Sequence, residues 1–212
     1  MINKIPNQII TAKLQPLNLS GVTKIALHHM ATDVGVKKIE EIHVLNNGWI
    51  AIGYNYWVGF DGTVYEGRGL NLGAGVDKQN SGIISIGFQG DYHSKAKSMS
   101  DAQFNAGIDV IQYVKSKVPA IKTIGGHKDF MATACPGQYF PLAEMIAGRK
   151  REKEEEKIMI YNYIDKNMPD WAREPVQWAV DNGVIMGTET GLNLDDKDLR
   201  YIVWLYRAKM VK

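Results

Sequence analysis

One short segment in the middle of the chain, together with a histidine pair far upstream, carries the residues best suited to chemistry. His127 and Cys135 lie eight residues apart, and Cys135 is the only cysteine of the 212-residue sequence. A Gly-Gly pair precedes the segment and a Pro-Gly pair follows the cysteine, which is typical of a shaped loop. The upstream pair is His28-His29. Two imidazoles and one thiolate form the ligand set of a zinc ion that keeps a fourth position open for water.

Each of these residues also has a structural interpretation. A single histidine on a strand is more often a packed, hydrogen-bonded residue than a ligand, and a lone buried cysteine usually acts as a small hydrophobic side chain. A blue-copper centre also combines two histidines with one cysteine, and it adds an axial methionine. The first methionine after Cys135 is Met145, in a predicted helix, and this spacing disfavours copper.

Alternating strands and helices are expected to position these residues. Runs rich in β-branched and aromatic residues predict strands at 24–29, 54–60, 63–66, 83–88 and 121–124, and helical spacing predicts helices at 36–47 and 100–118. Asp61-Gly62 predicts a hairpin and therefore one antiparallel pair. Ser100 is the expected N-cap of the longer helix, with Gln103 at the capping-box position. The pattern predicts an α/β fold, a mixed central sheet flanked by helices, while residues 1–20 give no clear signal.

A charged segment, residues 149–157, interrupts this composition. Oppositely charged side chains fall four residues apart, as in Lys150 and Glu154, which predicts a solvated helical linker. The linker would separate a larger domain at 1–148, which contains His28, His127 and Cys135, from a small all-α module at 158–212.

The C-terminal module is predicted to contain two helices. Trp171 and Trp178 share one helical face that ends near Asn182, with Pro175 near the first turn, which leaves the start of this helix open. Asp195 is expected to open the second helix. A module of about 55 residues buries only a limited core. We therefore expect the module to be stabilised by packing against the domain at 1–148 or by forming a homodimer with a second copy.

Bulk composition excludes several classes of protein. A net charge of +2 is too small for nucleic acid to be the main partner. The chain is 45% hydrophobic and 23% charged, as in globular proteins, and it has no apolar stretch of the ~20 residues that a membrane span needs. The N-terminus lacks the apolar core of a signal peptide, so we expect synthesis in the cytoplasm and no membrane insertion.

Five segments are most informative when they are taken together. They are Ile25–Thr32, Gly48–Tyr56, Asp61–Arg68, Asn80–Gly87 and Gly126–Gly137. In order and in spacing, between about Lys24 and Ala147, they closely resemble the type 2 N-acetylmuramoyl-L-alanine amidases. That family shares its fold with the peptidoglycan recognition proteins and includes many bacteriophage endolysins. The resemblance implies this fold, a Zn²⁺ cofactor and peptidoglycan as the partner.

The resemblance also implies roles for individual residues. The zinc ligands would be His28, His127 and Cys135, and the choice of His28 over His29 rests on the resemblance because strand alternation alone leaves it open. Tyr54 would be the active-site tyrosine, and Thr133 would donate a hydrogen bond or orient the substrate.

Three further polar residues are candidates for substrate contacts: Asn55, Asn80 and Gln89. For the two asparagines, turn or capping roles are equally expected. Gln89 stands where many family members have Glu, and a glutamine cannot act as a general base. We nevertheless expect activity that depends on Tyr54 and the metal. The family's frequent Gly-Ala-His is Gly73-Ala74-Gly75 in this chain, so one imidazole that could line the substrate site is absent.

The activity implied is zinc-dependent hydrolysis of the amide between N-acetylmuramic acid and L-alanine in Gram-positive peptidoglycan. The expected role is that of a phage or prophage endolysin, a bacteriolytic enzyme made in the host cytoplasm and reaching the wall after holin-type release. The C-terminal module is similar to helical modules of clostridial phage endolysins and loosely resembles surface-layer homology repeats, although it lacks their Thr-Arg-x-Glu signature. Wall binding is the preferred role for it, with dimerisation or stabilisation as alternatives.

Two other functions remain open at this point. One is a non-catalytic peptidoglycan recognition protein, although such relatives typically lose the zinc cysteine, and Cys135 is present. The other is a cytoplasmic amidase that recycles soluble muropeptides, which the added module disfavours.

Overall fold

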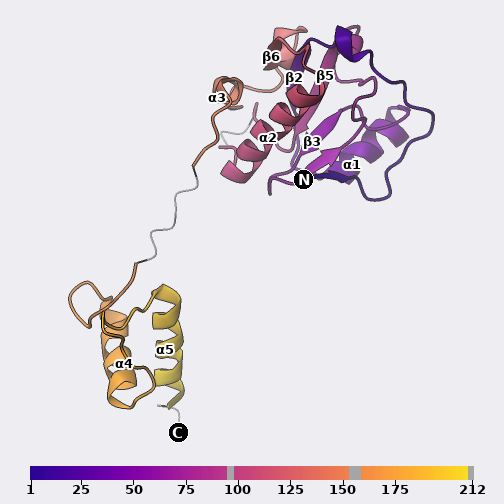
Figure 1. Ribbon diagram of the computed structural model, residues 1–212. Coiled ribbons are helices and arrows are strands. Elements are labelled where there is room, and N and C mark those ends of the chain that lie inside the picture. Colours follow the sequence, from indigo (N-terminus) through magenta and orange to yellow (C-terminus); the bar gives the residue numbers. More distant parts are fainter. Residues whose placement is uncertain (95–97, 153–158, 210–212) are drawn as a thin grey trace. The chain divides into compact units, whose positions relative to one another are not determined.

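The computed structural model describes residues 1–94, 98–152 and 159–209 (Figure 1). The chain divides into two compact units, Met1–Glu152 and Lys153–Lys212. Most of the predicted helical linker, 149–157, lies outside the described residues, and its described part, 149–152, is not helical. Among the described residues, no helix has both the length and the apolar character that crossing a membrane requires.

The first unit is built on a six-stranded sheet with the order β1-β4-β3-β5-β2-β6. The strands are β1 (Ile2–Lys4), β2 (Lys24–His29), β3 (Tyr56–Val58), β4 (Val64–Glu66), β5 (Ile83–Phe88) and β6 (Thr123–Gly126). Only β3 and β4 pair antiparallel, on either side of the predicted Asp61-Gly62 turn, and the other neighbours are parallel. The predicted mixed sheet is therefore confirmed. β1 adds an edge strand that was not predicted, and β6 begins two residues later than predicted.

Helices cover both faces of this sheet (Figure 1). On one face, α2 (Asp101–Lys117) and α3 (Leu142–Ala147) pack on alternate strand residues such as Ile25 and Leu27 to form the main core. A second core lies on the other face, where α1 (Val36–Glu41), continued by a π-helical turn (Ile42–Asn46), contacts Trp57. Because strand residues alternate between faces, Ala26 and His28 point away from α2.

The long helix begins as predicted, but only half of its capping box forms. The Ser100 side chain accepts a hydrogen bond from the Gln103 amide at 3.2 Å. The Gln103 side chain, expected to reach back to the cap, is instead fully buried. It accepts a hydrogen bond from the Tyr92 hydroxyl at 2.6 Å and donates to the carbonyls of Val58 and Gln89. Three tertiary hydrogen bonds outweigh the single local one.

The second unit pairs α4 (Asp170–Asp181) with α5 (Asp196–Lys209). Its core contains Tyr161, Met168, Ala172, Val176, Ala179, Leu194, Leu199 and Ile202. Asp195 opens α5 as predicted, because its carboxylate accepts the amides of Lys197 and Asp198 at 2.7 and 2.9 Å. The prediction for Pro175 is wrong: α4 starts at Asp170, which puts the proline in the second turn rather than the first.

Candidate metal centre

Two neighbouring parallel strands bring the distant histidines together. β2 and β6 pair in parallel, with Leu27 opposite Gly126, so the next residue of each strand emerges at the same edge of the sheet. These residues are His28 and His127, and their ring centroids lie 4.5 Å apart. The carboxyl edge of parallel strands is where open α/β sheets place their ligand sites.

A closed loop returns Cys135 to the same place. The Lys128 amide donates to the Cys135 carbonyl at 2.8 Å, and the Asp129 carboxylate accepts the Gly126 amide at 2.8 Å. Gly137, at φ 97°, lets the chain turn beneath Tyr92, whose carbonyl a side chain at 137 would meet. The Cys135 sulfur lies 3.9 Å from His28 Nδ1. One ligand atom from each of His28, His127 and Cys135 lies within 4.8 Å of the others, so the three could hold a metal ion.

Burial sets the protonation state of all three groups. His28 is only 2% exposed, and desolvation, followed by the proximity of His127 and His29, holds its pKa well below the usual range. Burial also lowers the pKa of His127. Burial raises the pKa of the Cys135 thiol to about 11. Neutral imidazoles are the metal-binding form of histidine, and a bound cation would displace the thiol proton.

The donor atoms of this cluster fit a metal centre. Nδ1 of His28 faces the Cys135 sulfur, while Nε2 of His28 and Nε2 of His127 are buried without a hydrogen-bond partner among the described residues. Two imidazoles and one thiol are the donor set of a catalytic zinc site with an open coordination position. The residues present therefore fit zinc.

Tyr54 lies beside His28 at the edge of the cluster. Its ring lies 5.3 Å from the His28 ring and packs over Gly87, where an added Cβ would come within 3.1 Å of the tyrosine. Burial, with a smaller contribution from Cys135, raises the pKa of the Tyr54 hydroxyl, so the group remains a neutral donor at physiological pH. His43 supports this segment: its Nδ1 accepts the Gly53 amide at 3.1 Å, and its ring packs 5.6 Å from Tyr54. Burial, followed by Arg68, lowers the pKa of His43 to about 4.

His29 points to the opposite face of the sheet from His28. Its Nδ1 accepts the Tyr92 amide at 3.1 Å, among residues of the α2 face. Only its backbone carbonyl approaches the cluster, 4.0 Å from the Cys135 sulfur. The structure thus brings His28, and not His29, to His127 and Cys135.

Asn55 has a structural role, which was the alternative to a substrate contact in the sequence interpretation. The residue is fully buried. Its amide donates to the carbonyls of Gly69 and Asn71 at 2.7 and 2.8 Å, and its oxygen accepts the Ser85 amide at 2.9 Å. Through these hydrogen bonds Asn55 links the segment that carries Tyr54 to β5 and to the loop at Gly69 and Asn71.

The side chains of the other predicted polar residues contact different parts of the protein. The Asn80 side chain accepts the Val76 amide at 2.9 Å, which is a turn role. Gln89 accepts the Phe60 amide at 3.1 Å and donates to the Asp33 carbonyl at 2.7 Å, so both ends of its amide have partners within the protein. Thr133 is exposed and accepts the Cys135 amide at 3.3 Å, beside the cluster.

Two buried residues near the site, Ser85 and Arg68, were given no role from the sequence. Ser85 is 1% exposed, and its hydroxyl has no hydrogen-bond partner among the described residues. A side chain at Gly75 would clash with that hydroxyl and lie 3.3 Å from His28 Nε2, so both atoms border the space that Gly75 leaves open. Arg68 is 6% exposed and donates to the carbonyls of Ile52, Leu72 and Ala51. The one signal in the sequence for Ser85 was its position as a lone hydroxyl residue within the apolar run Ile83–Phe88.

The fold and the cluster together define an α/β protein with a candidate single-metal centre at the carboxyl edge of its sheet. The family described as N-acetylmuramoyl-L-alanine amidase (Amidase_2) matches residues 18–138, more than half of the sequence, and the chain belongs to this family. The type 2 amidases and the peptidoglycan recognition proteins form one superfamily with this fold.

Individual relatives agree with this assignment. The chain is 36% identical over 105 residues to peptidoglycan-recognition protein SC2 of Drosophila simulans, a match that covers 48% of this chain and 56% of that protein. The chain thus spans about half the length of the curated relatives it matches. Among solved structures, the endolysin amidase LysCS from Clostridium intestinale aligns with a TM-score of 0.62 and 27% identity, covering 69% of this chain and 93% of LysCS. Bumblebee PGRP-SA aligns with a TM-score of 0.56 and 31% identity, covering 65% and 86%.

Proposed function

We propose that the protein is a zinc-dependent amidase that hydrolyses the bond between N-acetylmuramic acid and L-alanine in bacterial peptidoglycan. The observation that carries the proposal is the convergence of His28, His127 and Cys135 beside the Tyr54 segment. Family membership and the likeness to an endolysin amidase support it.

The zinc ion would be held by the two imidazoles and the Cys135 sulfur. The chemistry that zinc supplies in such a position is Lewis acidity toward a carbonyl oxygen and a lowered pKa for water. Because burial keeps the imidazoles neutral, neither needs to lose a proton before it binds the ion. The thiol must lose its proton, and the resulting thiolate reduces the net charge of the centre.

Tyr54 is suited to stabilise charge on the substrate. With its raised pKa the phenol keeps its proton, so it donates a hydrogen bond to the amide oxygen as negative charge develops there. Packing against Gly87 and His43 holds the ring in place before substrate arrives. Thr133, exposed next to Cys135, orients the substrate or donates a second hydrogen bond.

Gln89 does not supply a general base in this proposal. Its amide carries no titratable proton, and both of its ends hold backbone groups of neighbouring loops. Proton transfer to the leaving amine of L-alanine therefore passes through Tyr54 or solvent.

A second candidate is a non-catalytic peptidoglycan recognition protein. The names of the curated relatives favour it. The complete set of His28, His127, Cys135 and Tyr54 favours the amidase, since a recognition protein has no need of a metal-binding thiol.

The biological setting belongs to the same proposal. We infer a phage or prophage endolysin that lyses Gram-positive cells after holin-type release from the host cytoplasm, supported by the likeness to the LysCS endolysin. The second unit would attach the enzyme to the wall.

Product analysis separates the two candidate functions. Purified peptidoglycan is incubated with the wild-type protein and with Cys135→Ser, and new L-alanine amino termini are measured by mass spectrometry together with bound zinc. An amidase produces these termini, and Cys135→Ser loses both zinc and cleavage. Binding of peptidoglycan without new termini would establish the recognition protein instead, and full cleavage by Cys135→Ser would refute the ligand assignment.

A further inference from the structure

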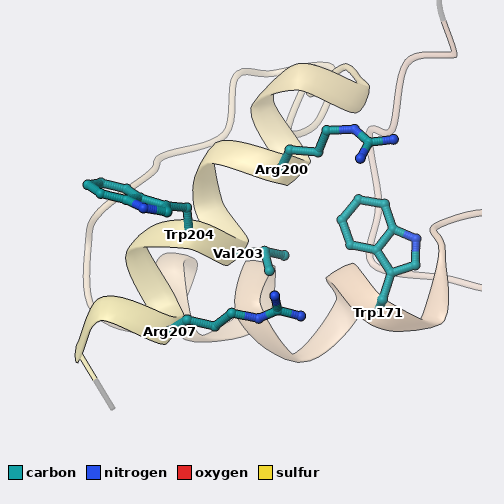
Figure 2. Close-up of a pocket in the computed structure, with 5 residues that line it drawn as sticks. All are labelled: Trp171, Arg200, Val203, Trp204 and Arg207. Atoms are coloured by element: carbon teal, nitrogen blue, oxygen red, sulfur yellow. The ribbon is translucent and has the colours of Figure 1, made fainter. Parts of the chain in front are cut away.

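The second unit has a groove on its surface, and the residues that line it are not among those of the hydrophobic cluster at the core of this unit. The groove is about 490 Å³ and lies between α4 and α5, lined by Trp171, Arg200, Val203, Trp204 and Arg207. The four α5 residues follow i, i+3, i+4, i+7 spacing and so form one stripe of the helix. Figure 2 shows the side chains of Arg200 and Arg207 directed toward Trp171 on either side of Val203, while Trp204 projects from α5 away from Trp171.

Two of the residues that line the groove are exposed tryptophans. Trp171 is 46% exposed and Trp204 is 62% exposed. Tyr201, which does not line the groove, is 61% exposed and stacks with Trp204 at 6.1 Å between ring centroids. Exposed aromatic surface of this kind marks a binding site more often than a packing defect.

Neither arginine has an acidic partner in the part of the chain that the structure describes. The guanidinium of Arg200 lies 5.8 Å from the centroid of the Trp171 ring, a cation–π contact. No carboxylate among the described residues pairs with Arg200 or with Arg207. The acids of the neighbouring helices have other partners: Asp170 pairs with Arg173 at 2.8 Å, Glu174 accepts the Tyr206 hydroxyl at 2.7 Å, and Asp196 accepts the Tyr161 hydroxyl at 3.2 Å.

An aromatic face flanked by two guanidinium groups, neither paired with an acid of the described residues, suits a ligand that joins an apolar ring face to a carboxylate. The planar guanidinium binds carboxylate through two parallel hydrogen bonds. Seven residues of helix separate the backbones of the two arginines by about 10 Å, which is comparable to the length of a disaccharide. The volume of the groove also falls within the usual range for small-ligand sites.

We propose that this groove binds the glycan strand of peptidoglycan where the lactyl carboxylates of muramic acid are free, with the carboxylates on Arg200 and Arg207 and a sugar face on Trp171. The inference rests on the proposed function, because hydrolysis of the muramyl–L-alanine amide adds water across that bond. One carboxylate remains on the sugar and one amine leaves with the peptide. The product of the first unit is thus the ligand of the second, and the enzyme stays on strands that it has begun to strip.

Two other occupants fit the groove less well. Acidic residues outnumber basic ones in the described part of this unit, which disfavours nucleic acid. A second copy joined by a two-fold axis at the groove would bring the arginines of both copies together, and their like charges would repel.

The test measures binding of the full-length protein, with EDTA present to stop hydrolysis, to glycan strands stripped of peptide by an unrelated amidase. The matched ligand is the same glycan with its carboxylates converted to amides. Arg200→Gln/Arg207→Gln is compared with Lys166→Gln/Lys197→Gln, which removes the same charge from exposed sites outside the groove. Wall teichoic acid, a phosphate polymer, and intact sacculi serve as further ligands, and light scattering reports the oligomeric state.

We expect the wild-type protein to bind the carboxylate glycan at least about ten-fold more tightly than the amidated one, as for loss of a charge-assisted hydrogen bond. The double arginine variant should lose about the same factor, whereas the double lysine control should stay within about two-fold of wild type.

Several outcomes would overturn the proposal. They are equal affinity for the two glycans, unchanged binding by the arginine variant, tighter binding to teichoic acid or to intact sacculi, and a dimer that the arginine variant dissociates. The glycan comparison uses wild-type protein, so it does not depend on how the variants fold. The ligand is made by another enzyme, so failure of this site and failure of amide cleavage by the protein itself are measured separately.

Discussion

Zinc binding to the metal-free protein should release one proton per ion at neutral and mildly alkaline pH. The pKa values of both histidines are lowered from 6.5 by burial, so above pH 7 these residues are already neutral and contribute no proton. The thiol of Cys135 has its pKa raised to about 11, so at pH 7.5 it is ionised in fewer than roughly one molecule in a thousand. As a ligand it must be ionised.

The size of the effect follows from linkage. One proton displaced per ion gives a ten-fold rise in zinc affinity for each pH unit, or about 1.4 kcal/mol. Between pH 7 and 9 the affinity should therefore rise about 100-fold. The rise ends only as the pH approaches the thiol pKa of about 11. At pH values below the histidine pKa values the slope becomes steeper, because protons then also compete for the imidazoles.

Competition with a zinc chelator of known affinity, repeated across this pH range, measures the slope. Calorimetry in two buffers that differ in ionisation enthalpy counts the released protons independently. Cys135→Ser is the control. A serine hydroxyl does not ionise in this range, so the much weaker zinc binding left to its two imidazoles should show a slope near zero. A flat profile for the wild-type protein would mean that the sulfur is not a ligand, and a slope near two would mean that a histidine is charged in the metal-free state.

Three further predictions concern single residues. Tyr54→Phe should keep its zinc but lose about 100-fold in turnover, as removal of one oxyanion donor does, and retention of full turnover in a steady-state assay would exclude that role. Gly75→Ala should lower the free energy of unfolding by about 1–3 kcal/mol in urea titration, because the new methyl group meets the Ser85 hydroxyl; Gly21→Ala, which opens onto empty space, is the control and should change it little. Asn55→Ala should cost about 2 kcal/mol or more of stability, since it leaves buried backbone groups without partners, and a variant of unchanged stability with weakened substrate binding would restore the substrate-contact interpretation.

Local signals in the sequence were sufficient for most of the scaffold. The apolar run Ile83–Phe88, the Ser100 cap and the Asp61-Gly62 turn each depend on neighbours a few residues away, and each appears where it was predicted. Pro175 was misjudged because packing of α4 on α5 extends the helix on the N-terminal side of a residue that usually marks a first turn.

The site required information that the sequence does not contain locally. Only the pairing of β2 with both β5 and β6, and the packing of α2 on one face, decides that His28 rather than His29 meets His127. For Asn55 the sequence left a substrate contact and a structural role open, and its burial depends on hydrogen bonds to the distant Ser85 and to the loop at Gly69. The cluster itself could be predicted only because several distant segments together resemble a known family.

The central claim is that His28, His127 and Cys135 hold a zinc ion on which cleavage of the muramyl–L-alanine amide depends. The most direct measurement follows new L-alanine amino termini from purified peptidoglycan as zinc is titrated back into EDTA-stripped, dialysed protein. The account predicts no termini without metal and full recovery at one zinc per chain. Cleavage by the metal-free protein, or none at any zinc concentration, would contradict it.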